Sequence, residues 1–361
     1  MEKDFRFNLE EAAGAVGDYG TLIPIIIGAA AVTDINLSSV LFFFAVSYIL
    51  TGLYYKLPMP VEPMKAIGAI AISGGLTGSE IAGAGIMMGL ILLFLGLIDG
   101  IKYIKKYIPK WLVRGIQLGL ALTLAKTAIN FLSTDLIIAS AAVSIILIFY
   151  FISLPDISSL LVFALGLGLG IYFNGFPPIV SFSWPTFSLP LAEDILSGFI
   201  KGAVPQITLT LGNAVLATTL LIHDLLGRDV SERKLVSSMG LMCLIPSVFG
   251  GFPMCHGAGG LAAQYRFGAR TGGSNIISGI IILFVAFFFA SQEIINIIPF
   301  SILGALLFFS ALQLLRSAVK TDNKLYTGLT GIGALFLGMS QAFLIMLSFH
   351  LVNEYLIKRE K

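Results

Sequence analysis

Charged residues are scarce in this chain. Asp, Glu, Lys and Arg make up 12% of its 361 residues, whereas soluble domains carry about 25%. Apolar residues make up 57%, and the mean hydropathy is +0.94. The net charge of +2 is too small to indicate a nucleic-acid partner. The composition therefore excludes an ordinary soluble domain and predicts a chain embedded in a lipid bilayer.

Residues that build metal, redox or nucleotide sites are also few. The two cysteines, Cys243 and Cys255, lie in or beside apolar segments, and only three histidines occur. The sequence contains no Cys-x-x-Cys pair and no Gly-x-x-x-x-Gly-Lys-Ser/Thr loop, which are the patterns typical of redox or zinc sites and of nucleotide hydrolysis. We therefore expect no cofactor, no metal and no enzymatic activity.

Long apolar runs fill most of the chain. A bilayer core of about 30 Å needs roughly 20 apolar residues per helix. By this measure we expect spans at 14–33, 39–56, 80–99, 112–132, 134–154, 157–174, 195–222, 235–250, 272–291, 298–317, 325–339 and 341–357. Two further segments, near 62–73 and 255–266, are shorter and broken by proline or glycine. Together these segments predict an all-α polytopic membrane protein of about fourteen segments, seven in each half.

The basic residues test this count. If the N-terminus is cytoplasmic and each segment crosses once, 19 of the 22 Lys and Arg residues fall on the cytoplasmic side, as the positive-inside rule requires. The connection 175–194 falls outside and contains no Lys or Arg. An odd number of segments per half inverts the second half relative to the first. We therefore expect inverted repeats at residues 1–174 and 195–361, joined by the external connection 175–194, in a plasma-membrane protein with both termini cytoplasmic.

The first broken segment contains Pro58, Pro60 and Pro63 within six residues. Proline lacks an N–H and restricts the residue before it, so residues 57–61 are expected to be extended and a helix to begin near Pro63. The first turn of such a helix has unpaired N–H groups and a positive dipole end, which favour an anion. Lys65 adds a full positive charge. The candidate substrate-binding residues here are Pro63, Met64, Lys65 and Ala66.

The second broken segment runs from Gly250 to Gly260 and is rich in glycine, which lets backbone approach a ligand closely. A helix that begins near His256 would aim N–H groups inward again. In an inverted repeat the two helix starts face each other at mid-membrane. The alternative is a pair of kinks that serve packing alone. The candidate substrate-binding residues here are His256, Gly257, Ala258 and Gly259.

Polar side chains also occur within the long apolar segments. Asp18 and Thr21 lie three residues apart in the first span and share a helix face. Gln206, Thr210 and Asn213 follow i, i+4, i+7 spacing in a later span, so they form one polar stripe. We consider Thr21 and the stripe as neutral donors to a substrate, and Asp18 with Glu62 as coupling groups. The alternatives are a hydrated Asp18 at a helix end and a stripe that hydrogen-bonds between helices.

Three motifs carry a resemblance to a known family. Residues 14–21, 58–66 and 253–272 read GAVGDYGT, PMPVEPMKA and PMCHGAGGLAAQYRFGARTG. They resemble the molybdate transporter branch of the sulfate permease (SulP) superfamily, and the resemblance runs from about residue 9 to 350. It implies the fourteen-segment fold shared with uracil permeases, a core domain that moves against a gate domain, molybdate or sulfate as substrate, and no appended STAS domain. It also implies Gln where this chain has Glu62, so this carboxylate bears on substrate charge or on coupling.

The sequence therefore favours a secondary active transporter of a tetrahedral oxyanion, bound between the two helix starts. Energy is expected from a proton or sodium gradient, or from exchange, and a homodimer is compatible with the sequence. Three alternatives stay open. The first is a nucleobase or organic-anion carrier of the same fold, the second is an anion channel, and the third is an intramembrane enzyme that uses Cys255 and His256 or Asp18.

Overall fold

The computed structural model describes residues 4–104, 107–151, 157–176, 182–290 and 298–359. The elements of the first half are α1 (Leu9–Ala15), α2 (Tyr19–Val32), α3 (Leu37–Tyr55), β1 (Glu62–Pro63), α4 (Lys65–Ile72), α5 (Gly78–Leu97), α6 (Ile101–Ile104), α7 (Lys110–Leu132), α8 (Leu136–Phe151) and α9 (Ser158–Asn174). Those of the second half are α10 (Ala192–Gly198), η2 (Phe199–Ala203), α11 (Val204–Leu209), η3 (Thr210–Ala217), α12 (Thr218–Leu226), α13 (Glu232–Ser247), β2 (Met254–Cys255), α14 (Ala258–Arg266), α15 (Gly273–Phe288), α17 (Phe300–Ala318), α18 (Lys324–Leu337) and α19 (Met339–Arg359).

Most apolar segments become helices close to their predicted bounds, but the expected span 14–33 is divided between α1 and α2, which residues 16–18 separate. Six of the described helices or helix runs are long and apolar enough to cross a bilayer, and four shorter apolar helices accompany them. The longest is the run α10–α12, which contains two π-helical stretches, η2 and η3, and continues from Ala192 to Leu226. This architecture is that of a multi-pass membrane protein, as the hydropathy predicts.

The two broken segments differ from the prediction in where their helices begin. α4 begins at Lys65 and α14 at Ala258, each two residues later than the expected starts near Pro63 and His256. The reason is that the residues before them pair as β1 and β2, an antiparallel ladder. Each half therefore has a short strand followed by a short helix as its third segment.

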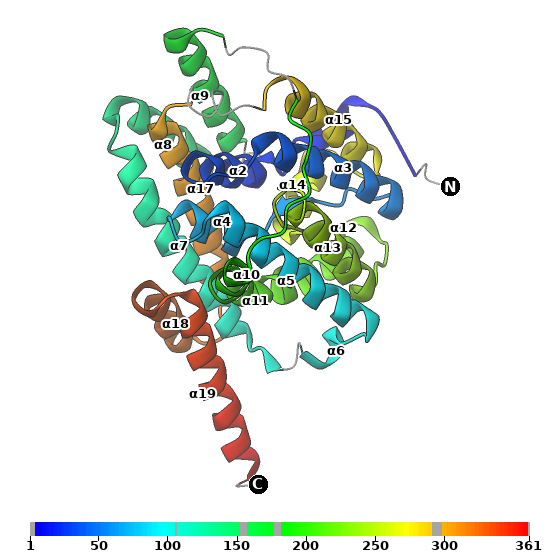
Figure 1. The fold of residues 1–361 in the computed structure, drawn as a ribbon, viewed down its shortest axis with the longest axis vertical. Coiled ribbons are helices and arrows are strands. Elements are labelled where there is room, and N and C mark those ends of the chain that lie inside the picture. Colours follow the sequence, from blue (N-terminus) through cyan, green and yellow to red (C-terminus); the bar gives the residue numbers. More distant parts are fainter. Residues whose placement is uncertain (1–3, 105–106, 152–156, 177–181, 291–297, 360–361) are drawn as a thin grey trace.

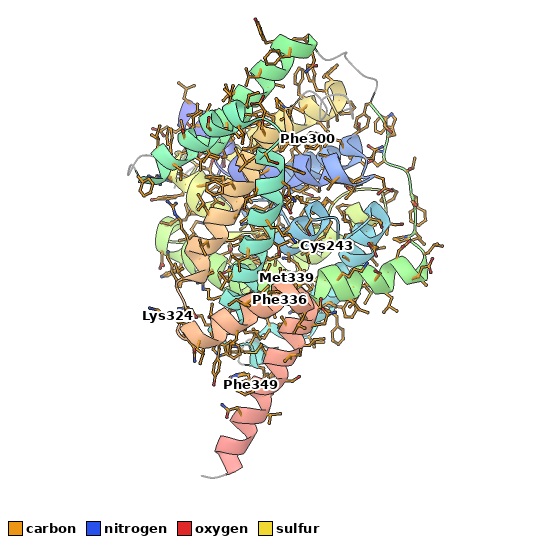
Figure 2. All side chains as sticks on the ribbon, turned by 90° about the vertical axis from the view of Figure 1, so that its left-hand side faces the viewer. Cys243, Phe300, Lys324, Phe336, Met339 and Phe349 are labelled. Carbon is orange, nitrogen blue, oxygen red and sulfur yellow. The ribbon has the colours of Figure 1, made fainter. Side chains whose placement is uncertain are left out.

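The helices pack into two groups. The first group consists of α1–α5 with α10–α15, in which α3 packs on α15 and α5 on α13. The second group consists of α7, α8, α9, α17, α18 and α19, in which α17 and α18 pack on α7. Figure 1 shows α7, α8, α9 and α17 on the left, α3, α13 and α15 on the right, and α4 and α14 between them. α19 extends from the second group toward the C-terminus, and Figure 2 shows Phe336 and Met339 side by side where α18 gives way to α19.

Small residues allow the helices of the first group to lie close together. A Cβ atom on Gly272 would lie 2.2 Å from the carbonyl oxygen of Gly52, and one on Gly279 would lie 2.7 Å from that of Ala45. The α3–α15 interface therefore needs glycine at both positions. Close approach through small residues is the usual way in which membrane helices pack.

Candidate functional site

The ladder of β1 and β2 joins the two broken segments. Glu62 lies opposite Cys255 and Pro63 opposite Met254, and the N–H of Met64 donates to the carbonyl oxygen of Pro253 at 3.0 Å. Because the strands are antiparallel, α4 and α14 run away from the ladder in opposite directions. Both helices begin beside this short ladder, in the interior of the molecule (Figure 1).

The Glu62 carboxylate lies against the first turn of α14. A Cβ atom on Gly257 would lie 1.7 Å from Oε2 of Glu62, and one on Gly260 would lie 2.8 Å from Oε1. Only glycine leaves room for the carboxylate at these two positions. The side chain of Glu62 is fully buried, and its Oε2 lies 3.1 Å from Nζ of Lys65, whose side chain is 17% exposed. The carboxyl group of Glu62 therefore already occupies the positive end of α14.

A second carboxylate, that of Asp18, lies beside the first. Asp18 is the N-cap residue of α2, and its Oδ2 accepts a hydrogen bond from the Tyr48 hydroxyl at 2.5 Å. Gly17 packs directly on the backbone of Gln264 in α14, which brings Asp18 against Gly260. The site therefore combines two buried carboxylates with the single ammonium group of Lys65, a net charge of −1 when all three are ionised.

A cavity of about 580 Å³ opens beside these groups. Of the predicted site residues, Asp18, Thr21, Lys65 and Gly259 line it. The opposite wall comes from the second helix group and includes Gln117 of α7, Ser159 of α9 and Ser310 of α17. The lining also includes three basic residues, Arg266, Arg316 and Lys320. The cavity therefore lies between the two helix groups and connects Lys65 with a basic rim.

Gln206 and Thr210 of the predicted polar stripe face the start of α4. Oε1 of Gln206 accepts the Ala66 N–H at 2.8 Å, and its Nε2 donates to Oγ1 of Thr210 at 3.1 Å. Neither residue is among those that line the cavity. This geometry is that of an interhelical bond which caps α4. Asn213 belongs to η3, and its side chain lies outside the part that the structure describes.

His256 connects the second broken segment to its surroundings. Its Nδ1 lies 2.8 Å from the carbonyl oxygen of Pro60, and its Nε2 lies 2.8 Å from Oγ of Ser238. Since a carbonyl only accepts, Nδ1 carries the proton and Nε2 accepts from the Ser238 hydroxyl. The side chain is buried and does not line the cavity, and neither do Pro63, Met64, Ala66, Gly257 and Ala258.

Sequence reasoning missed the groups that the second helix group contributes. Gln117, Ser159 and Ser310 are single polar residues in apolar helices, with no spacing pattern to link them. Gln117 is buried, and its Oε1 accepts a hydrogen bond from Nη1 of Arg114 at 2.9 Å. The one signal available was that an isolated polar side chain in a membrane helix usually faces other protein segments or a cavity.

The chain matches the family described as "Molybdate transporter of MFS superfamily" over residues 10–124 and 198–314. It is 35% identical to molybdate transporter 2 of Arabidopsis thaliana, over 87% of this chain and 80% of that protein. Its fold is similar to that of the transmembrane domain of a cyanobacterium bicarbonate transporter, BicA, with a TM-score of 0.65 and 16% identity, over 95% of this chain and 96% of the other. It is also similar to the murine Solute Carrier 26 family member A9 anion transporter in its inward-facing state, with a TM-score of 0.74 and 13% identity, over 99% and 69%. These relatives are named transporters, in agreement with the expectation that the chain is not an enzyme.

Proposed function

Since the chain belongs to the molybdate transporter family, we propose that it is a secondary active transporter of a tetrahedral oxyanion, molybdate or sulfate. The oxyanion binds in the cavity beside Lys65 and the first turn of α14. The first helix group carries it past the second in an elevator-like movement.

The position of Lys65 is the observation that carries this proposal. Its ammonium group is the cation at the inner end of the cavity, 4.0 Å from where a Cβ of Gly259 would lie. Moving a dianion out of water is far too costly unless charge and hydrogen bonds compensate. Lys65 supplies the charge, the first-turn N–H groups of α14 have no acceptors within their own helix, and Thr21, Gln117 and Ser159 supply neutral polar groups.

The two carboxylates support coupling to protons. With Asp18, Glu62 and Lys65 all ionised, the site carries a net charge of −1 and repels a dianion. Protonation of one carboxylate makes it neutral, and protonation of both makes it positive. Oxyanion binding and proton binding therefore favour each other, and we propose that at least one proton travels inward with each oxyanion.

The packing of the helices supports the proposed elevator-like movement of the first helix group against the second. The cavity has one wall from each helix group, so a displacement of one group against the other would move the site. We propose that residues 1–174 and 195–361 are the two inverted repeats and that the connection 175–194 is external. The rim with Arg266, Arg316 and Lys320 then faces the cytoplasm of a plasma-membrane protein, as the positive-inside rule favours.

Uptake into proteoliposomes tests this function. We expect saturable uptake of labelled molybdate that unlabelled molybdate and sulfate inhibit and uracil does not. Inhibition by uracil without inhibition by either oxyanion would identify a nucleobase carrier instead. Flux that stays linear with molybdate concentration would identify a channel. A Cys255→Ser variant should transport normally, because its thiol has no part in this mechanism.

A further inference from the structure

We propose that Glu62 is a resident counter-anion: it neutralises Lys65 whenever the cavity is empty, so that the empty carrier can return across the membrane without a bound oxyanion. This inference rests on the proposed oxyanion transport and adds a second partner for the same lysine. It predicts that the chain carries out net uptake, and that without Glu62 it can only exchange one oxyanion for another.

The geometry shows how Glu62 fills the place of an anion. Its carboxylate contacts the start of α14 at Gly257 and Gly260, and Lys65 lies 3.1 Å away. Apart from Lys65, neither carboxylate oxygen has a hydrogen-bond partner among the described residues. Charge and the helix dipole therefore hold this group, rather than a set of directional bonds that a substrate would have to break.

The other ionisable groups near Glu62 form no ion pair with Lys65 among the described residues. Asp18 comes from the start of α2, and its Oδ2 accepts a hydrogen bond from the Tyr48 hydroxyl of α3. Cys255 of β2 lies opposite Glu62 in the ladder, yet a buried thiol carries no charge that could balance an ammonium group. Glu62 is thus the carboxylate in direct contact with Lys65, and the two residues move together because both belong to the segment of β1 and α4.

The need for such a partner follows from the cost of an unpaired buried charge. Removing one member of a buried ion pair is strongly unfavourable, because it leaves the other charge uncompensated in a medium of low dielectric constant. Lys65 therefore needs an anion throughout the movement of the site across the membrane. An oxyanion serves in one direction, and the Glu62 carboxylate serves on the return.

Two transport modes measured on the same variant test the inference. Net uptake is measured into liposomes without internal substrate, and exchange into liposomes preloaded with unlabelled molybdate. Both use equal pH on the two sides and a membrane potential clamped at zero, so uptake is driven by the molybdate gradient alone. For Glu62→Gln we expect net uptake to fall at least about tenfold more than exchange falls, since the uncompensated lysine blocks the return step that only net uptake requires.

A matched control comes from a second ammonium–carboxylate pair in the same helix group. Nζ of Lys201 lies 2.8 Å from Oε1 of Glu80, but the Lys201 side chain is 50% exposed and is not part of the cavity lining. Lys201→Gln should therefore leave the ratio of net uptake to exchange unchanged. Glu62→Asp keeps the negative charge and should retain much of the net uptake, which provides a second variant if Glu62→Gln does not fold.

Several outcomes would overturn the inference. Downhill net uptake that survives in Glu62→Gln would mean that Glu62 only carries a proton. Equal losses of net uptake and exchange would mean that Glu62 only shapes the site. A ratio of net uptake to exchange that is as low in Glu62→Asp as in Glu62→Gln would mean the same. Absence of molybdate transport in both modes for the wild-type protein is a different result, because it would overturn the proposed function itself.

Discussion

The starts of α4 and α14 occupy equivalent positions in the two halves of the chain, yet different groups face them. A neutral amide oxygen, that of Gln206, accepts a hydrogen bond from the first turn of α4. A carboxylate, that of Glu62, lies against the first turn of α14 and pairs with Lys65. The cavity reaches Lys65 and Gly259 but not Gln206. Two similar helix starts thus meet different groups, a neutral amide in one case and a carboxyl group paired with Lys65 beside the cavity in the other.

The largest expected effect comes from the charged side of this comparison. Lys65→Ala should raise the Kd for molybdate and sulfate by roughly tenfold to a hundredfold, about 1.4–2.8 kcal/mol, because a dianion then lacks its counter-charge. Lys65→Arg should keep part of the affinity, since the charge remains while its reach and geometry change. Isothermal titration of purified protein measures both. Unchanged oxyanion affinity in a folded Lys65→Ala protein would contradict the assignment.

The second prediction concerns the two glycines at the start of α14. Gly257→Ala should lower the free energy of unfolding by about 1–3 kcal/mol, as overpacking does, because its Cβ would lie 1.7 Å from Oε2 of Glu62. Gly259→Ala is the matched control, since its Cβ meets only the end of the Lys65 side chain at 4.0 Å. Thermal unfolding in detergent compares them. Equal melting temperatures would show that Glu62 does not lie against Gly257.

A smaller effect is expected on the neutral side. Gln206→Ala removes the acceptor for the Ala66 N–H and should cost about 0.5–2 kcal/mol of stability, as the loss of a helix cap does. Its effect on oxyanion affinity should stay within about threefold, well below that of Lys65→Ala. Thermal unfolding and titration of the same sample separate the two quantities. A loss of affinity as large as that of Lys65→Ala would make Gln206 a substrate ligand.

The smallest effect belongs to the rim. Lys320 is exposed and lines the cavity, so it attracts an oxyanion from a distance without holding it. Lys320→Gln should slow association by about twofold to fivefold at low ionic strength, because steering by surface charge is screened by salt. Stopped-flow binding at two salt concentrations measures this. A difference that persists at high salt would indicate direct contact with the bound anion.

Most of the fold could be predicted because the positions of apolar runs and of charged loops can be read directly from the sequence. Most apolar runs became helices near their expected bounds, the exception being the run 14–33, which is divided between α1 and α2. The proline and glycine breaks at 57–63 and 250–257 indicated the two short helices. The starts at Lys65 and Ala258 could not be predicted, since they depend on pairing between Glu62 and Cys255, residues far apart in sequence.

The site was predicted less completely. Asp18, Thr21, Lys65 and Gly259 line one cavity, and the sequence signals for them were polar or charged groups within apolar segments and glycine in a broken segment. The sequence offered His256 at an expected helix start and Gln206 in a polar stripe as candidate ligands. Their partners show that they connect segments instead: Pro60 and Ser238 for His256, and Ala66 for Gln206. The position of the Glu62 carboxylate under α14 depends on three-dimensional contacts that no spacing reveals.

Isothermal titration of the wild-type protein with molybdate, sulfate and uracil, repeated in two buffers of different ionisation enthalpy, tests the central claim most directly. It yields the affinity and the number of protons bound with the ligand. We expect both oxyanions to bind, with uptake of about one proton and tighter binding as pH falls, since protonation of Asp18 or Glu62 removes a repelling charge. Uracil should not bind. Oxyanion binding without proton uptake at any pH, or binding of uracil alone, would contradict the account.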